Sequence, residues 1–336
     1  MFSEFNQGFD VAQIRFRYVQ YCIIFCLLWA QPSAAEWYTD EQEKMGTRVE
    51  VQLWSEEPAA APVLLEAAMA EFDRIEALMS TYIDSSEMSR VNQHAFATPQ
   101  KVSPELFALL QDALQMSALT GGAFDITFDS VGELYDFRSG IKPTAADIAE
   151  QLGKINYRLV KLDEDNGTVS FAVSGVRINL GGIAKGYAVE RVIELLADAG
   201  IKNALATAGG DTRLLGDRHG APWIVGIRDP NDKDAVFTRL ALENEAISTS
   251  GDYERFFIED GKRYHHILRP GDGKPVEGVR SVSVIGPDAT VTDGLSTSIF
   301  VMGPEAGLAM IAKLPGYEAV VITDDELFYS EGLNPG

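Results

Sequence analysis

The hydrophobic pattern changes its period within one short segment, residues 178–194, INLGGIAKGYAVERVIE. The residues up to Leu180 are typical of the end of a strand, whereas from Lys185 onward apolar residues recur with helical spacing. Between them, Gly181 and Gly182 allow a tight turn and a close approach of the backbone to a ligand. The segment therefore predicts a strand, a glycine turn and the first turns of a helix.

Such a corner is chemically suited to a phosphate group. The start of a helix presents unpaired N–H groups and about half a positive charge, and Lys185 would add a full positive charge. The glycine spacing matches neither the Rossmann nor the Walker pattern, however. An ordinary strand–turn–helix corner without a ligand therefore stays open on this segment alone.

The rest of the sequence predicts short strands and several helices. Helices are expected at residues 59–79, after Ser103-Pro104, and at 292–302 and 304–314, and hairpins around 165–167, 259–261 and 324–325. Residues 80–93 are expected to form a loop, and GAFDITF, residues 122–128, a short strand or an extended loop. The pattern contains no repeat or linker. It favours an α+β fold, a single domain with a largely antiparallel sheet and helices packed on it.

The N-terminal residues have the features of a secretory signal peptide. Arg15 and Arg17 precede an apolar run at residues 21–30, and small residues lead to a cleavage position after Ala35. The run is too short to span a bilayer, and a buried strand or a short anchor is the alternative. The expected division is a signal peptide, residues 1–35, and a mature domain, residues 36–336. Both cysteines lie in the excised run, so the mature chain would fold without disulfides or thiol chemistry.

The charge of the chain limits its partners. The formal net charge is −22 at pH 7, and removal of residues 1–35 takes away two arginines and two acidic residues, which leaves it unchanged. A surface this acidic repels nucleic acid and anionic lipid. A polyanionic ligand can bind only where a metal ion or a helix terminus reverses the local field. We therefore expect no nucleic-acid partner.

A carboxylate and a hydroxyl with helical spacing form the second candidate site. In VTDGLSTSIF, residues 291–300, Thr292 is expected to cap a helix that begins at Asp293, and Thr297 lies four residues after Asp293 on the same face. Carboxylate and hydroxyl oxygens, completed by water and substrate phosphates, suit Mg²⁺. The alternative is a plain helix cap followed by a threonine that is bonded to its own helix.

The third candidate site is the histidine pair in RYHHILRPGDGKPV, residues 263–276. His265 and His266 are neighbours on a predicted strand and therefore point to opposite sides, so one can face the core and the other a cleft. A neutral imidazole is a usable general base near neutral pH. A purely structural role for both histidines is the alternative.

Several turns carry further candidates, each of which is equally compatible with ordinary turn chemistry. They are Met45-Gly46-Thr47 at a strand start, Tyr82 after a helix, Gly122-Ala123-Phe124-Asp125, and the hydroxyl-rich turn at residues 248–252. The chain contains no H-E-x-x-H, G-x-S-x-G or C-x-x-C motif. The usual residues of metalloproteases, serine esterases and thiol redox enzymes are therefore missing.

Taken in order, these segments resemble the ApbE family of FAD:protein FMN transferases. The resemblance runs from Met45-Gly46-Thr47 through STYIDSSEMSRVN, TGGAFDIT, NLGGIAKGYA, ATAGGD, STSGDYERF, YHHIL-x-P and TDGLSTSIF to YSEGL, about nine tenths of the mature chain. It implies an exported, periplasmic enzyme that binds FAD together with Mg²⁺. Such an enzyme transfers the FMN moiety to a Thr or Ser hydroxyl of a target protein through a phosphoester bond and releases AMP.

The resemblance also implies roles for individual residues. Asp293 and Thr297 would hold the metal together with a main-chain carbonyl, here that of Gly182. Asp293 and His266 would be catalytic, with His266 or a nearby Asp taking the proton of the acceptor hydroxyl. Contacts with FAD would come from Met45, Tyr82, Ala123, Phe124, Asp125, Asn179, Gly181, Lys185, His266, Ile267 and Leu268.

Two positions depart from the family pattern. Asn179 stands where many members have Asp, and Arg269 stands where an Asp usually precedes the proline. The first departure removes a charge beside the glycine turn. The second is expected to affect how the loop holds the adenosine end of FAD, or the rate of transfer.

Two further functions stay open on the sequence alone. One is a Mg²⁺-dependent FAD pyrophosphatase that releases FMN and AMP, and the other is a periplasmic FAD-binding module without catalysis. If the enzyme is a transferase, its partner is a flavin-accepting protein such as a subunit of a membrane redox complex. That partner would bring the protein close to the inner membrane.

Overall fold

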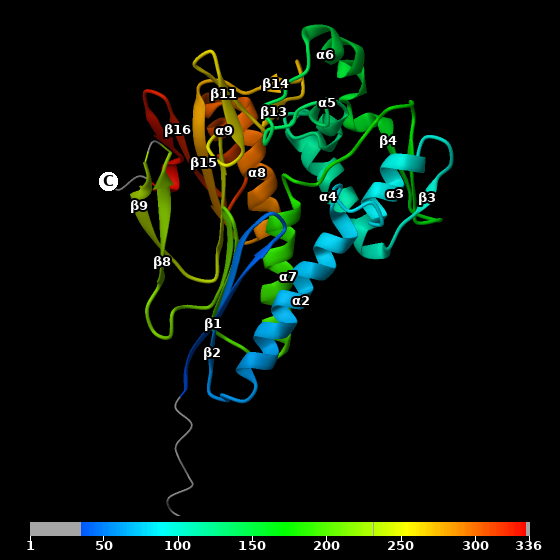
Figure 1. The fold of residues 1–336 in the computed structure, drawn as a ribbon. Coiled ribbons are helices and arrows are strands. Elements are labelled where there is room, and N and C mark those ends of the chain that lie inside the picture. Colours follow the sequence, from blue (N-terminus) through cyan, green and yellow to red (C-terminus); the bar gives the residue numbers. More distant parts are fainter. Residues whose placement is uncertain (1–34, 231, 334–336) are drawn as a thin grey trace, which may run out of the picture.

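An antiparallel sheet forms the centre of the molecule (Figure 1). In this computed structural model, which describes residues 35–230 and 232–333, the sheet contains eight strands in the order β1-β2-β6-β7-β10-β15-β16-β17. Every adjacent pair is antiparallel. The strands are β1 (Glu36–Lys44), β2 (Thr47–Ser55), β6 (Ala204–Ala208), β7 (Asp211–Leu215), β10 (Ala246–Gly251), β15 (Val279–Gly286), β16 (Glu318–Thr323) and β17 (Leu327–Tyr329). The prediction of a mixed fold with a largely antiparallel sheet is confirmed.

Helices cover one face of this sheet and a two-stranded ribbon covers the other (Figure 1). The helices are α2 (Ala61–Met79), α7 (Ala184–Asp198) and α8 (Ala289–Met302), and the ribbon strands are β8 (Trp223–Asp229) and β9 (Asp232–Leu242). Trp223 of the ribbon packs in one apolar cluster with Leu214 and Ile247 of the sheet. A larger cluster fills the space between the sheet and the helices.

A second group of short elements lies beyond the three helices, on the side away from the sheet (Figure 1). It contains α3 (Glu87–His94), α4 (Pro104–Leu119), α5 (Asp129–Gly132), α6 (Ala145–Gln151), the 3-10 turns η1 (Ile126–Phe128), η2 (Leu152–Lys154) and η3 (Tyr157–Leu159), and a small sheet of β3 (Gln100–Lys101), β5 (Thr168–Phe171) and β4 (Val160–Asp163). The remaining elements are the hairpins β11 (Phe256–Glu259) with β12 (Lys262–His265) and β13 (Leu268–Arg269) with β14 (Lys274–Pro275), then α9 (Pro304–Ile311) and η4 (Glu331–Leu333).

Local sequence signals explain most of these boundaries. At the start of α4, the Ser103 hydroxyl accepts a hydrogen bond from the Leu106 N–H at 3.3 Å, and Pro104 occupies the first helical position, as predicted. The apolar stripe of α2 is buried, but the helix starts at Ala61, two residues later than predicted. The three predicted hairpins are all present.

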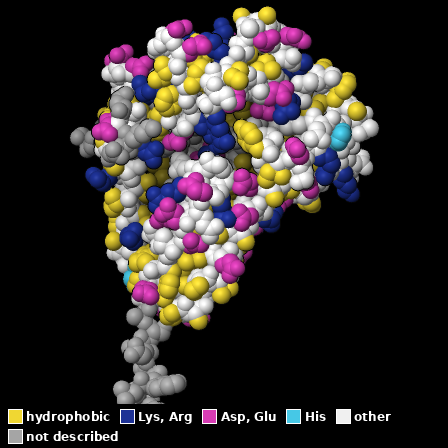
Figure 2. All heavy atoms as spheres, in the orientation of Figure 1, with side chains coloured by type: hydrophobic (Ala, Val, Ile, Leu, Met, Phe, Trp, Pro, Cys, Tyr) yellow, Lys and Arg dark blue, Asp and Glu magenta, His cyan; other side chains and the backbone are white. Residues whose placement is uncertain are grey.

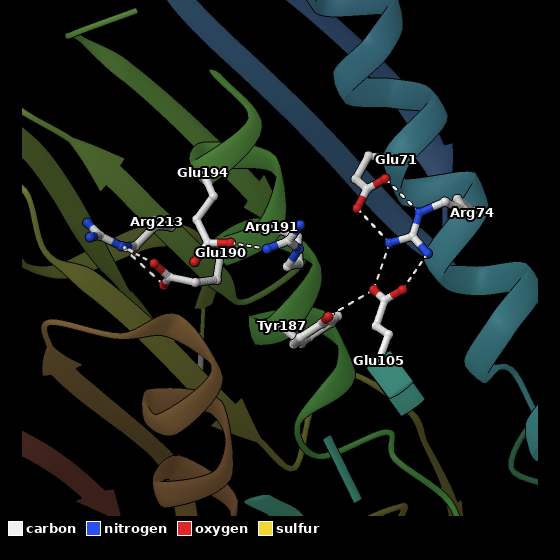
Figure 3. Close-up of polar contacts among 8 residues, drawn as sticks. All are labelled: Glu71, Arg74, Glu105, Tyr187, Glu190, Arg191, Glu194 and Arg213. Atoms are coloured by element: carbon white, nitrogen blue, oxygen red, sulfur yellow. Dashed lines mark hydrogen bonds and ion pairs between the residues drawn. The ribbon is translucent and has the colours of Figure 1, made fainter. Parts of the chain in front are cut away.

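Polar contacts hold α7 on both sides (Figure 3). The Tyr187 hydroxyl donates to Glu105 of α4 at 2.8 Å, and Arg74 of α2 donates to the same carboxylate at 2.6 Å. On the other side, Arg213 of β7 donates to Glu190 at 3.0 Å. These bonds tie α7 to two helices and to the sheet. The glycine turn that precedes α7 therefore has a fixed position.

Two predictions about the chain before α7 are wrong. Residues 177–180 form no strand, because the backbone of Ile178 exchanges hydrogen bonds with the Asn92 side chain and the Asn179 N–H donates to the Ile126 carbonyl. The apolar alternation there reflects burial within a loop. The predicted loop at residues 80–93 contains α3, whose start is capped by Ser86.

Three predictions near the other candidate segments also need correction. Helix α8 begins at Ala289, because Asp288 caps it by accepting from the Val291 N–H at 2.9 Å, so Thr292 lies inside the helix. Within GAFDITF, residues 126–128 form the turn η1, because Asp125 accepts from the Thr127 N–H, whereas residues 122–125 lie in a loop. The predicted strand through the histidines is interrupted, since β12 ends at His265 and β13 begins at Leu268.

The predicted signal peptide, residues 1–35, lies outside the described residues except for Ala35. Among the helices of the described ranges, none has the length and apolar character that a membrane crossing requires.

Candidate functional site

The start of α7 and the first half of α8 touch each other at Gly186. The Gly186 N–H donates to Asp293 Oδ2 at 2.9 Å. A Cβ atom on Gly186 would lie 2.6 Å from the Asp293 Cβ and would also collide with the Ala289 carbonyl. Only glycine therefore permits this approach, which brings the Asp293 carboxylate to the positive end of α7.

The three residues predicted to hold a metal lie close together. Asp293 and Thr297 occupy successive turns of α8, and a Cβ on Gly182 would lie 3.2 Å from Thr297 Oγ1. The Thr297 hydroxyl lies 3.2 Å from Ser250 Oγ, and the described structure shows no bond from it to its own helix. The alternative of a back-bonded threonine fits Thr292 instead, which donates to the Ala289 carbonyl at 3.1 Å.

The donor set at this point suits a hard cation. A carboxylate, a hydroxyl and a nearby glycine backbone offer oxygen ligands only, which is what Mg²⁺ prefers. Within residues 35–230 and 232–333, no group of three or more His, Cys, Asp or Glu side chains is placed to bind a metal. A cation at Asp293 would therefore take mixed protein oxygens and complete its shell with water or substrate. The residues present fit that description.

Lys185 is neutralised by two carboxylates. Its Nζ forms an ion pair with Asp211 of β7 and lies 4.0 Å from Asp293 Oδ2. Burial alone would lower the pKa of Lys185, but attraction to Asp211 and Asp293 outweighs it and raises that pKa. Burial, with repulsion from Asp211, raises the pKa of Asp293, and attraction to Lys185 opposes this. Lys185 was predicted to contact a phosphate, but its positive charge is already paired with protein carboxylates.

The two histidines lie in different environments. His265 is buried, and its Nε2 donates to the Val276 carbonyl at 2.7 Å, which gives it a structural role. His266 is half-buried as a whole, but its Nδ1 is buried and has no hydrogen-bond partner among the described residues. Burial, followed by repulsion from Arg255, lowers the pKa of His266 to about 3. The His266 imidazole is therefore neutral at physiological pH and, in this environment, a weak base.

Apolar and aromatic residues stand at several of the predicted FAD contacts. Phe124 is buried with one ring carbon 3.2 Å from the Cβ position of Gly182, and Ala123 beside it is half-buried. Tyr82 follows α2 and is 83% exposed, so its ring is free to stack on a planar ligand. Met45 forms the β1–β2 turn with a φ of 53°.

Two predicted contacts, Asp125 and Asn179, use their side chains within the protein. Asp125 accepts from the N–H groups of Thr127 and Tyr157, both at 2.8 Å. Asn179 accepts from the Gly181 N–H at 2.8 Å and donates to Asp129 Oδ1 at 3.1 Å. These bonds shape the loops on either side of the glycine turn. Ile267 and Leu268, which follow His266 in the chain, are both buried.

The two departures from the family pattern have local explanations. Asn179 is an amide facing the Asp129 carboxylate, and an Asp at this position would place two carboxylates together. Arg269 forms an ion pair with Asp272 at 2.8 Å within its own turn. The charge of Arg269 therefore has a partner, and the amide of Asn179 avoids a second carboxylate beside Asp129.

Sequence reasoning missed Asp211 and Arg255. Asp211 is 1% exposed, and its Oδ1 has no hydrogen-bond partner among the described residues. Its signal was the Gly209-Gly210 pair before it: Gly209 has a φ of 62°, and a Cβ on Gly210 would collide with the Thr249 carbonyl. Arg255 gave no such signal, because it lies in an irregular loop.

The structure thus combines an antiparallel sheet with one helix whose carboxylate and hydroxyl lie against the start of a second helix. The chain belongs to the ApbE family, whose sequence model matches residues 45–321.

Relatives with curated names extend over most of the chain. A Treponema pallidum protein named FAD:protein FMN transferase is 33% identical over 310 residues, covering 86% of this chain and 85% of the relative. A Vibrio cholerae protein of the same name is 35% identical over 253 residues, covering 74% and 76%.

Solved structures share the fold. The crystal structure of the ApbE protein from Thermotoga maritima superposes with a TM-score of 0.82 at 34% identity, covering 88% of this chain and 98% of that one. The flavin transferase ApbE from Vibrio cholerae superposes with a TM-score of 0.80 at 30% identity, covering 90% and 99%.

Proposed function

We propose that this protein is a FAD:protein FMN transferase that depends on Mg²⁺ and releases AMP. The names of its relatives support flavin transfer. The observation that carries the proposal is the meeting of Gly182, Asp293 and Thr297 at the start of α7. These residues would supply oxygen donors for a cation beside the glycine turn, where the diphosphate would lie.

In the proposed reaction, the acceptor hydroxyl oxygen forms a bond to the phosphorus of the FMN moiety. The bond from that phosphorus to the bridging oxygen breaks, and AMP leaves with the bridging oxygen. Mg²⁺, held by Gly182, Asp293 and Thr297, would neutralise charge on the phosphoryl oxygens. His266, whose lowered pKa keeps its imidazole neutral, or a nearby Asp would take the hydroxyl proton.

Other residues of the site orient the substrate. Phe124 provides an apolar wall at the glycine turn, and exposed Tyr82 offers a ring on which the flavin can stack. The positive end of α7 would face the diphosphate, although the N–H groups of Ala184 and Gly186 already donate to the Leu180 carbonyl and to Asp293. The bonds of Asp125 and Asn179 keep the adjoining loops in place.

The test combines the protein, FAD, Mg²⁺ and a flavin-accepting domain, and follows covalent flavin on the acceptor and free FMN in solution. Asp293→Asn should abolish transfer, because it removes the carboxylate charge. Asp288→Asn is the matched control: it lies on the same helix but caps its start, and Asn is an equally good cap. Free FMN without covalent product would indicate hydrolysis, and intact FAD would indicate a binding module.

We also propose export to the periplasm, with cleavage after Ala35 and an acceptor in a membrane redox complex. The sequence of residues 1–35 supports export. N-terminal sequencing of the protein from the periplasmic fraction should begin at Glu36. Recovery of full-length protein from the cytoplasm would contradict this part of the proposal.

A further inference from the structure

The candidate site contains too little free positive charge for a diphosphate. Lys185 carries one positive charge, but Asp211 and Asp293 face it with two carboxylates. His266 is neutral at physiological pH. The molecule as a whole carries a formal net charge of −22. A dianionic group that enters here therefore needs a cation other than Lys185, in addition to any metal.

Arg255 is an exposed guanidinium at the edge of this site. Its main-chain carbonyl accepts from the His266 N–H at 3.2 Å, so the two residues are neighbours. Its Nη2 lies 3.2 Å from the Cβ position of Gly46, which places the guanidinium on the β1–β2 turn. Arg255 thus lies between His266 and the turn of Met45, two segments predicted to contact FAD.

The charge of Arg255 is not used inside the protein. Among the described residues, nearby carboxylates have other partners: Asp252 pairs with Arg263 at 2.7 Å and Arg280 at 2.9 Å, and Glu254 pairs with Arg228 at 3.4 Å. No ion pair between Arg255 and a described carboxylate occurs in the structure. In the space-filling view, Lys and Arg side chains gather around the hollowed middle of the face shown (Figure 2).

The loop that carries Arg255 is held firmly. Asp252 is buried between Arg263 and Arg280, and its N–H donates to the Arg280 carbonyl at 3.1 Å. Tyr253 is buried next to it. The backbone of Arg255 is therefore positioned in advance, which lowers the entropy lost when its side chain binds a ligand.

We propose that Arg255 binds the phosphate groups of the flavin dinucleotide and supplies the positive charge that Lys185 does not have free. This inference rests on the proposed function. A guanidinium presents N–H donors in a planar fork that matches phosphate oxygens, and such charge-assisted bonds are among the stronger ones in proteins. Arg255 is thus a specificity residue for the anionic part of FAD.

The experiment measures the FAD dissociation constant in the presence of Mg²⁺ at low and high NaCl, and the KM values for FAD and for the acceptor. The variants are Arg255→Gln, Arg255→Lys and the control Arg48→Gln. Arg48 lies two residues after Gly46, but its guanidinium already pairs with Glu41 at 2.5 Å and Glu50 at 3.4 Å. Melting temperatures of all variants verify that the fold is kept.

Arg255→Gln should weaken FAD binding about ten- to a hundredfold, which is the range for a hydrogen bond to a charged group. Its KM should rise for FAD and not for the acceptor, and its FAD affinity should depend less on salt than that of the wild type. Arg255→Lys should restore part of the affinity, and Arg48→Gln should stay within about twofold of the wild type.

Two results would overturn the inference while leaving the proposed function in place. One is a wild-type FAD affinity in Arg255→Gln, and the other is a KM increase confined to the acceptor. If the wild-type protein itself bound no FAD with Mg²⁺ present, the proposed function would fail together with the inference.

Discussion

Replacing Gly186 by alanine tests how closely α7 and α8 must approach. The new Cβ would lie 2.6 Å from the Asp293 Cβ and would also collide with the Ala289 carbonyl. Restoring an ordinary carbon–carbon contact of about 3.5–4.0 Å requires the two helices to separate by roughly 1 Å. Overpacking of this kind costs about 1–3 kcal/mol, and the better helix propensity of alanine offsets about 1 kcal/mol of it. The expected loss of unfolding free energy is therefore small, about 0–2 kcal/mol.

The effect of Gly186→Ala on activity should be much larger than its effect on stability. The separation moves the Asp293 carboxylate away from the start of α7 and away from Gly182. A displacement of about 1 Å can lower a catalytic rate by about a hundredfold. We expect that decrease in the rate of flavin transfer, measured under saturating FAD and Mg²⁺, in a variant whose urea unfolding curve is close to that of the wild type.

Gly153→Ala is the matched control, because its Cβ would meet no heavy atom within 4 Å. It should transfer flavin at the wild-type rate. A Gly186→Ala variant that is as active as Gly153→Ala would refute the argument that helix contact positions Asp293.

Two further predictions concern stability. Because burial lowers the pKa of folded His266 to about 3, whereas an unfolded histidine titrates near about 6.5, the unfolded state binds the proton first as the pH falls. The contribution of His266 to stability is present above about pH 6.5 and is lost toward about pH 3. His266→Gln should therefore lose less unfolding free energy than the wild type when the pH falls from about 6.5 to about 3, as measured by urea unfolding. An equal loss in both proteins would contradict this. Asn179→Asp should lower the unfolding free energy at pH 7 by about 1 kcal/mol, because it replaces the amide donor that lies 3.1 Å from Asp129 Oδ1 by a carboxylate. Adding Asp129→Asn should recover part of that loss, and a double variant without recovery would show that the two positions do not interact.

The parts of the fold set by local chemistry were predictable. Ser103 and Pro104 start α4, because a hydroxyl cap and a proline act within one turn. Asp293 and Thr297 share a face of α8, because residues four apart lie one turn apart. The exact start of α8 was not predictable, because Asp288, Thr290 and Thr292 can all act as caps in sequence, and only Asp288 accepts the bond.

The parts set by tertiary contacts were not predictable from residue patterns. Residues 177–180 alternate like a strand, but they are buried in a loop that the Asn92 side chain satisfies. Asp211 of β7 forms an ion pair with Lys185. The two residues are too far apart in the sequence for a helix or strand period to predict this contact. The closeness of Gly182 to Thr297 followed from the family resemblance and not from spacing.

The most direct test of the account is a titration of FAD into the purified protein with and without Mg²⁺, repeated with Asp293→Asn. The central claim is that Gly182, Asp293 and Thr297 bind a divalent cation against the diphosphate of FAD. The account predicts FAD binding that Mg²⁺ strengthens in the wild type and leaves unchanged in Asp293→Asn. A wild-type protein that shows no affinity for FAD at saturating Mg²⁺, or the same affinity with and without it, would contradict the claim.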